Sequence, residues 1–309
     1  MKLLKTYPRL FLLIAIIAIS SASLLIRSAQ QTFSSLFIAA ARLLIAGVFL
    51  TPIQFKKKIQ ELRNFHLAGW LSIFLSSIFL AFHFIFWISS LETTSVISSV
   101  VLVTTTPIWV ALLSPYLLDE KLTKQFYLGL LIAFFGIIAL VMSSVCSIGA
   151  QALICNFQDE LFQNSALFGS MLALFGALCA AGYVLSGKKI RKDISNMTYV
   201  TIVYLIAGSI CLLIFMFNQS GPFINVKLNE WMSLLLIAVV PQLIGHSLIN
   251  AALGYLPAAH VSLALLGEPV GSSILTFVIF NEVPSVVEGF GAVVIILGIY
   301  TAMKKKPSC

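Results

Sequence analysis

Charged residues are scarce in this chain. They make up 10% of its 309 residues, while apolar residues make up 60%. A soluble domain carries about 25% charged residues, so this sequence has too little charge to cover a surface that faces water. The composition therefore excludes a soluble globular protein. The net charge of +8 fits either nucleic acid or a membrane as the partner, and the positions of the basic residues decide between them.

Motifs of ATP-driven pumps and of common hydrolases are absent as well. The sequence has no Gly-x-x-x-x-Gly-Lys-Ser/Thr loop for ATP, no Gly-x-Ser-x-Gly and no His-Glu-x-x-His. No carboxylate or cysteine stands three or four residues from any of the four histidines, so no metal site is expected. Nothing in the sequence calls for a cofactor.

Long apolar stretches fill most of the chain. A bilayer core of about 30 Å needs roughly 20 apolar residues per helix. Because backbone polar groups in lipid must be satisfied within the segment, stretches of this length predict an all-α integral membrane protein. Ten such stretches are predicted, at about 8–27, 33–55, 67–89, 94–118, 125–144, 164–186, 197–217, 231–252, 257–280 and 286–303.

The basic residues are divided unequally between the two faces of this ten-helix arrangement. With the N-terminus in the cytoplasm, 16 Lys and Arg residues fall on the inner side, Arg27 and Lys227 fall on the outer side, and Arg42 lies within a span. The positive-inside rule then predicts that both termini are cytoplasmic, in the cytoplasmic (inner) membrane. The excess of basic residues therefore indicates how the protein is oriented in a bilayer, and nucleic acid is not an expected partner.

The chain also resembles itself at a fixed offset. A shift of 162 residues aligns Pro107 with Pro269, Leu113 with Leu275, Glu120 with Glu282, Gly129 with Gly291, Gly136 with Gly298 and Ile137 with Ile299. We therefore expect two five-helix repeats, at residues 1–150 and 160–309. Because five is odd, the second repeat would enter the membrane inverted, as in many secondary transporters that bind substrate near the midplane between the halves.

Both repeats carry motifs that resemble EamA domains of the drug/metabolite transporter superfamily. The matching residues are Thr106-Pro107-Ile108, Asp119-Glu120-Lys121-Leu122-Thr123, Gly129 and Gly136, and then Gly267-Glu268-Pro269-Val270, Asn281-Glu282-Val283-Pro284, Gly291 and Gly298. The resemblance covers nearly the whole chain and implies a ten-helix carrier of small metabolites, often an exporter, that works without ATP. One departure is Ser34-Ser35-Leu36 at the start of the second span, where many relatives have a proline.

Glu268 is the candidate site residue with the clearest chemistry. An ionisable group within a span is costly and by default faces a cavity. Pro269 follows it and removes a backbone donor, so a kink is expected there, and Pro107 is expected to kink the fourth span in the same way. Glu268 would bind an amino or cationic group of the substrate or carry a proton. The alternative is a structural hydrogen bond between helices.

Further polar residues within the spans complete the expected site. Gln242, His246 and Asn250 follow one another at intervals of four, which places them on one face of an α-helix, and His83 and Trp87 are also four apart. Their side chains would line a substrate cavity, with Trp87 stacking on the substrate, or they would pack between helices. Arg42 would hold an anionic group of the substrate or act in structure or gating.

Two cysteines, Cys146 and Cys155, fall in the predicted outer loop 145–163 and can form a disulfide there. Its expected role is to staple the loop.

These features favour a secondary active transporter, most simply an exporter, of small metabolites or amino-acid-like compounds. It would work by alternating access, driven by a proton gradient or by exchange. Its expected partners are a small-molecule substrate and the lipid bilayer, and it would be a monomer or a homodimer. The alternatives are an intramembrane enzyme, for which no motif is present, and a non-transporting receptor or scaffold, which would need no polar cavity.

Overall fold

The computed structural model describes residues 6–63, 65–94, 96–148, 153–155, 164–191, 193–218, 226–280 and 285–304. Nearly all of these residues are helical. The helices before the central loop are α2 (Pro8–Ile19), α3 (Ala22–Ala29), α4 (Ser35–Leu50), α5 (Phe55–Arg63), α6 (Leu67–Thr93), α7 (Val96–Val103), α8 (Thr106–Leu117) and α9 (Lys124–Val145). Those after it are α11 (Asn164–Ile190), α12 (Asn196–Phe217), α13 (Leu228–Ile237), the π-helical segment η1 (Ala238–His246), α14 (Ser247–Leu253), α15 (Ala258–Ala264), α16 (Gly267–Phe280) and α17 (Val286–Met303).

Eight helical stretches of the described residues are long and apolar enough to cross a bilayer, or nine if α4 and α5 form one bent span. The ten predicted spans are therefore not confirmed as a count. The fifth, at 125–144, corresponds to α9, in which Lys124–Ala139 is an apolar helix shorter than the candidate spans. The chain is nevertheless a multi-pass membrane protein with an all-helical membrane part.

The predicted second span, 33–55, is wrong at its end. Helix α4 stops at Leu50 and the chain turns by 97° into α5. The Lys58 ammonium group of α5 donates hydrogen bonds to the carbonyl oxygens of Leu50 and Thr51, which satisfies backbone acceptors at the end of α4. These bonds hold the beginning of α5 against the end of α4 at the turn.

A short hairpin joins the two parts of the chain. Strands β1 (Cys146–Ile148) and β2 (Leu153–Cys155) are antiparallel, and Cys146 lies opposite Cys155 in the register. Opposite residues in such a ladder have Cα atoms about 4.5–5.5 Å apart, which is within the range that a disulfide spans. The side chains of both cysteines lie outside the described part of the structure, so the disulfide stays a prediction.

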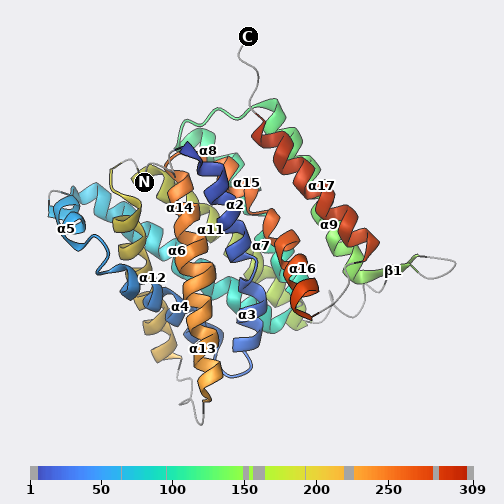
Figure 1. The fold of residues 1–309 in the computed structure, drawn as a ribbon, viewed down its shortest axis with the longest axis horizontal. Coiled ribbons are helices and arrows are strands. Elements are labelled where there is room, and N and C mark those ends of the chain that lie inside the picture. The colour runs from blue at the N-terminus through green and yellow to red at the C-terminus, as the bar shows by residue number, and fades with distance from the viewer. Residues whose placement is uncertain are drawn as a thin grey trace.

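Helices from the two parts of the chain pack in pairs. Helix α6 lies against α11, α4 against α12, and α9 against α17, and Figure 1 shows α9 and α17 side by side along one edge. Glycines permit the closest approach. A Cβ atom on Gly129 would lie 2.5 Å from the carbonyl oxygen of Gly298, and one on Gly136 would lie 2.7 Å from that of Gly291.

The beginning of α2 and the end of α17 lie at the same face of the bundle (Figure 1). Arg9 donates a hydrogen bond from Nη2 to the carbonyl oxygen of Met303, at 2.8 Å. The two ends of the described helices therefore meet on one side of the bundle.

Several helices are interrupted partway along their length. Turns separate α2 from α3, α7 from α8, and α15 from α16. Pro107 and Pro269 lie in the first turns of α8 and α16, positions that tolerate a missing N–H. Each proline lies just after a break between two helices, and the kinks predicted at these prolines stay a prediction.

Candidate functional site

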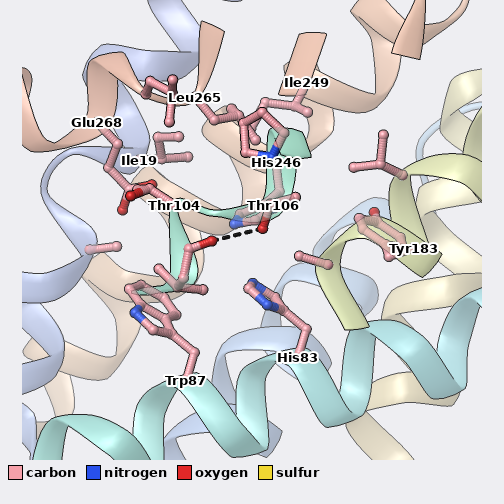
Figure 2. Close-up of a pocket in the computed structure, with 16 residues that line it drawn as sticks. Ile19, His83, Trp87, Thr104, Thr106, Tyr183, His246, Ile249, Leu265 and Glu268 are labelled. Carbon is pink, nitrogen blue, oxygen red and sulfur yellow. Dashed lines mark hydrogen bonds between the residues drawn. The ribbon is translucent and has the colours of Figure 1, made fainter. Parts of the chain in front are cut away.

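The interruptions surround a cavity of about 70 Å³ inside the bundle. Most of its lining is apolar, and its polar and aromatic lining residues are His83, Trp87, Thr104, Thr106, Tyr183, His246 and Glu268. Figure 2 shows how they are arranged: Glu268 and Trp87 lie on one side, Tyr183 on the other, and His83 and His246 approach from opposite directions. Four of the seven predicted site residues thus share one cavity, and Pro107 lines it as well.

The lining residues come from both parts of the chain at corresponding positions. Val103 and Leu265, Thr104 and Leu266, and Thr106 and Glu268 are all lining residues, and the members of each pair are 162 positions apart. The same offset relates Trp87 to Ile249, and Ala22 to Val184. The offset found in the sequence thus also relates lining residues from the two parts of the chain.

Glu268 lies in the first turn of α16, directly after the turn that ends α15. Its carboxylate points into the cavity (Figure 2) and forms no hydrogen bond or ion pair with a described residue. The corresponding residue at the start of α8, Thr106, is satisfied within the protein. Its hydroxyl donates to the carbonyl oxygen of Val103 at 2.7 Å.

His83 and Trp87 lie on consecutive turns of α6 with their rings stacked, at 6.0 Å between centroids and 7° between planes. The Nδ1 atom of His83 lies 2.9 Å from the carbonyl oxygen of Gly176. Because a carbonyl only accepts, Nδ1 carries the proton, and Nε2 of the neutral ring is an acceptor. The Nε1 atom of Trp87 is buried without a hydrogen-bond partner among the described residues. The pair therefore gives the cavity an aromatic wall.

The predicted stripe of Gln242, His246 and Asn250 does not face one environment. Residues 238–246 form a π-helix, in which hydrogen bonds run from i to i+5, so a spacing of four does not align side chains as it does in an α-helix. Among the three residues, His246 alone lines the cavity. Gln242 accepts a hydrogen bond from Arg42, and Asn250 donates from Nδ2 to the Tyr183 hydroxyl at 2.6 Å and to the His246 carbonyl at 2.7 Å.

Arg42 lies fully buried behind the cavity wall. Its Nε donates to Oε1 of Gln242 at 3.0 Å, and its guanidinium carbon lies 4.1 Å from the ring centroid of Phe84. Phe84 in turn packs edge-on against His246, with 5.2 Å between the ring centroids. The guanidinium is therefore separated from the cavity by one layer of side chains.

No group of three or more His, Cys, Asp and Glu residues in the described ranges is arranged to hold a metal ion. Although His83, His246 and Glu268 line the same cavity, they do not converge on one point.

The sequence profile of the EamA-like transporter family matches residues 7–142 and 167–303. The chain belongs to the EamA-like transporter family. As a member of this family with multiple apolar helices, it is a multi-pass membrane transporter.

Curated relatives share the family's general description. The chain is 25% identical over 271 residues to the uncharacterized transporter YyaM of Bacillus subtilis, covering 86% of this chain and 81% of YyaM. It is 27% identical over 272 residues to an uncharacterized transporter of Acidianus ambivalens, covering 88% and 94%. A solved structure superimposes with a TM-score of 0.75 over 97% of both chains at 17% identity, so the two chains share one fold.

Tyr183 is a lining residue that the sequence did not single out. Its neighbours along the chain are small or apolar, so nothing local sets it apart. Thr104 and Thr106 precede Pro107 in the sequence, where their hydroxyls were expected to bond back to their own helix, and in the structure they donate to the carbonyl oxygens of Val101 and Val103.

Proposed function

We propose that this EamA-family protein is a secondary active transporter that exports small metabolites or amino-acid-like compounds across the cytoplasmic membrane by alternating access. The observation that carries the proposal is the unpaired Glu268 carboxylate in a cavity enclosed by both parts of the chain. A carboxylate inside a membrane protein is costly, and a substrate cation or a proton would offset that cost.

The offset between the cavity walls supports two inverted five-helix repeats, residues 1–150 and 160–309. In such transporters the substrate site lies at the interface of the repeats, where helices are discontinuous. Here α7 and α8 in the first half, and α15 and α16 in the second, are interrupted at positions that differ by about one residue after the 162-residue shift. The cavity lies at both interruptions.

The size of the cavity supports a carrier that changes shape. Sites for small molecules usually have volumes of about 300–1,000 Å³, whereas this cavity has about 70 Å³. A metabolite would therefore need the helices around the cavity to separate. Alternating access supplies such a movement as one half rocks against the other.

The orientation follows from the charges. The beginning of α2 and the end of α17 lie on one face, and the predicted division of basic residues by 16 to 2 supports a cytoplasmic location for that face. The driving force would be a proton gradient or exchange against another solute. Glu268 is the residue that would take up the proton or the amino group.

The test is flux in proteoliposomes loaded with radiolabelled amino acids and amines. Glu268→Gln and His246→Ala are each expected to lower the flux at least tenfold. The control variants are Asp119→Asn and His66→Ala, which change an exposed carboxylate and an exposed histidine. Both controls are expected to keep the parent rate. If both site variants insert normally and transport at the parent rate, the site is wrong. If the flux does not change with an imposed pH gradient and needs no counter-substrate, neither proton coupling nor exchange drives the transport.

The same samples distinguish the other classes. An intramembrane enzyme would release a chemically altered product, which mass spectrometry of the flux medium detects. A receptor or scaffold would show no flux of any probe. Crosslinking in membranes and sizing in detergent would separate a monomer from a homodimer.

A further inference from the structure

Helix α5 packs against the bundle with polar side chains. Lys58 is only 6% exposed and donates to the carbonyl oxygens of Leu50 and Thr51. Glu61, three residues further along and so on the same side of the helix, accepts hydrogen bonds from the backbone N–H and the hydroxyl of Ser195 at 3.1 and 2.8 Å. These contacts fix which face of α5 is turned towards the protein.

The opposite face of α5 carries apolar and basic side chains together. Phe55 and Ile59, four residues apart, are 54% and 51% exposed, and Lys56 and Arg63 are exposed on the same face. A surface helix of a soluble protein buries its apolar side chains, so α5 has the reverse arrangement. Exposed apolar residues beside basic ones are typical of helices that lie in the interface between lipid and water.

The position of α5 fits such an interface. The stretch Pro8–Ala29 runs away from the face of the bundle where α2 begins, and α4 returns towards that face (Figure 1). The chain then turns by 97° into α5, which lies at the edge of the bundle (Figure 1). Because α4 runs across the apolar layer, a turn of this size directs α5 along the surface of the membrane, on the face proposed to be cytoplasmic.

A groove of about 420 Å³ lies on α4 directly before this turn. Its lining residues are all apolar and recur at the spacing of one helix face: Leu44, Ile45, Val48, Phe49 and Pro52. Val48 and Phe49 are 62% and 53% exposed. Since the lining belongs to the last turns of an apolar helix, the groove faces the hydrocarbon of the leaflet next to α5.

Two cations of α5 remain available for an anionic group. Lys57 forms an ion pair with Glu61 at 3.7 Å, and Lys58 is engaged by the end of α4. Lys56 and Arg63 form no ion pair or hydrogen bond with a described residue. Basic side chains at a membrane surface are attracted by anionic lipid headgroups, so the exposed face of α5 matches such headgroups in charge.

We propose that α4 and α5 form a binding site for an anionic phospholipid, with an acyl chain in the groove of α4 and the phosphate on Lys56 and Arg63. An acidic protein segment would match the two cations but would leave the groove, which lies at the depth of the hydrocarbon, without an occupant. A lipid without net charge would fill the groove but would not neutralise the cations. This inference goes beyond the proposed transport function and does not depend on it.

The experiment measures lipid binding to the purified full-length protein by native mass spectrometry, which resolves the protein with each bound lipid. The probes are dioleoylphosphatidylglycerol, dioleoylphosphatidylcholine, which has the same acyl chains and no net charge, and glycerophosphoglycerol, which is the anionic headgroup without acyl chains. Because each basic residue near an anionic surface strengthens binding roughly fivefold, the phosphatidylglycerol is expected to bind at least about tenfold more tightly than the phosphatidylcholine. The free headgroup is expected to bind more weakly than either lipid.

The variants separate the headgroup from the acyl chain. Lys56→Gln and Arg63→Gln are each expected to weaken the phosphatidylglycerol about fivefold and to leave the phosphatidylcholine unchanged, which also shows that these variants are folded. Val48→Trp fills the groove and is expected to weaken both lipids equally. The matched controls are Lys124→Gln and Leu128→Trp, which change exposed positions of α9 and are expected to leave all affinities unchanged.

Several results would overturn the lipid site. They are binding of neither lipid, equal affinities for the two lipids, and a preference for phosphatidylglycerol that survives both Lys56→Gln and Arg63→Gln. Binding of the free headgroup as tightly as the whole lipid would show a site for a soluble phosphate compound. Unchanged affinities in Val48→Trp would show that the groove holds no acyl chain and that α5 attracts anionic groups without a built site.

Discussion

Replacing Asn250 by alanine should show how firmly the cavity residue Tyr183 is held in place. Asn250 is completely buried and donates two hydrogen bonds from Nδ2, to the Tyr183 hydroxyl at 2.6 Å and to the His246 carbonyl at 2.7 Å. A hydrogen bond of this kind contributes about 0.5–1.5 kcal/mol net in proteins and averages about 0.6 kcal/mol, with a maximum near 1.7, within membranes. Loss of both bonds should lower the free energy of unfolding by about 1–3 kcal/mol, in addition to the cost of the space left by the side chain.

A double-mutant cycle isolates the bond to Tyr183. The variants are Asn250→Ala, Tyr183→Phe and the combination, and the free energy of unfolding is measured by denaturant titration in mixed micelles. The cost of the cavity at position 250 appears in both the single and the double variant and cancels. Because the bond is short and fully buried, we expect a coupling energy of about 0.6–1.7 kcal/mol, in the upper part of the membrane range.

The control cycle pairs Asn250→Ala with Ser72→Ala, whose hydroxyl bonds to Ala68 in its own helix. These two changes should add within about 0.5 kcal/mol. A coupling between Asn250 and Tyr183 no larger than in this control would refute the reasoning, because it would mean that the hydroxyl is not held by the amide.

Three further predictions concern the frame around the cavity. Gly136→Ala should lower the free energy of unfolding by about 1–3 kcal/mol, because its Cβ would lie 2.7 Å from the Gly291 carbonyl oxygen. The control is Gly289→Ala, whose Cβ would meet nothing within 4 Å and which should cost less than about 0.5 kcal/mol. Thermal unfolding measures both variants. Cys146 and Cys155, opposite each other in the hairpin, should be recovered as one disulfide-linked peptide by mass spectrometry before reduction, and free thiols at both positions would contradict this. A cysteine introduced at Lys304 should react with a membrane-impermeant thiol reagent only after the cells are permeabilised, because this position is expected on the cytoplasmic side. Labelling of this cysteine in intact cells would contradict the proposed orientation.

The sequence was sufficient to predict features that depend on local composition. Apolar length located the helices, and the glycines that recur in the repeats mark places where helices α9 and α17 make close contact. The importance of the residues in the first turns of α8 and α16 could also be predicted, because a proline or an ionisable group in an apolar segment is recognised from the sequence without knowledge of tertiary contacts. Glu268 accordingly lines the cavity where its sequence position suggested.

Features that depend on neighbours were not predictable in the same way. The π-helical segment around Gln242 changes the angular spacing of its side chains, and sequence periodicity assumes an α-helix. The bend after Leu50 depends on Lys58 reaching back to carbonyl groups, and the contact of Arg42 with Gln242 joins residues 200 positions apart. Tyr183 was missed because its role arises from a hydrogen bond with Asn250, 67 positions away.

The pairing of cavity residues at a constant offset has a consequence for how a substrate is oriented. If the lining residues at corresponding positions were identical, a ligand could bind in either of two equivalent directions, and a polar molecule would gain nothing from facing one way. Thr106 and Glu268 occupy corresponding positions with different chemistry, so the two directions differ in energy. Trp87 and Ile249, and Thr104 and Leu266, also differ across the same offset, so a glutamate placed at position 106 alone would not make the two directions equivalent.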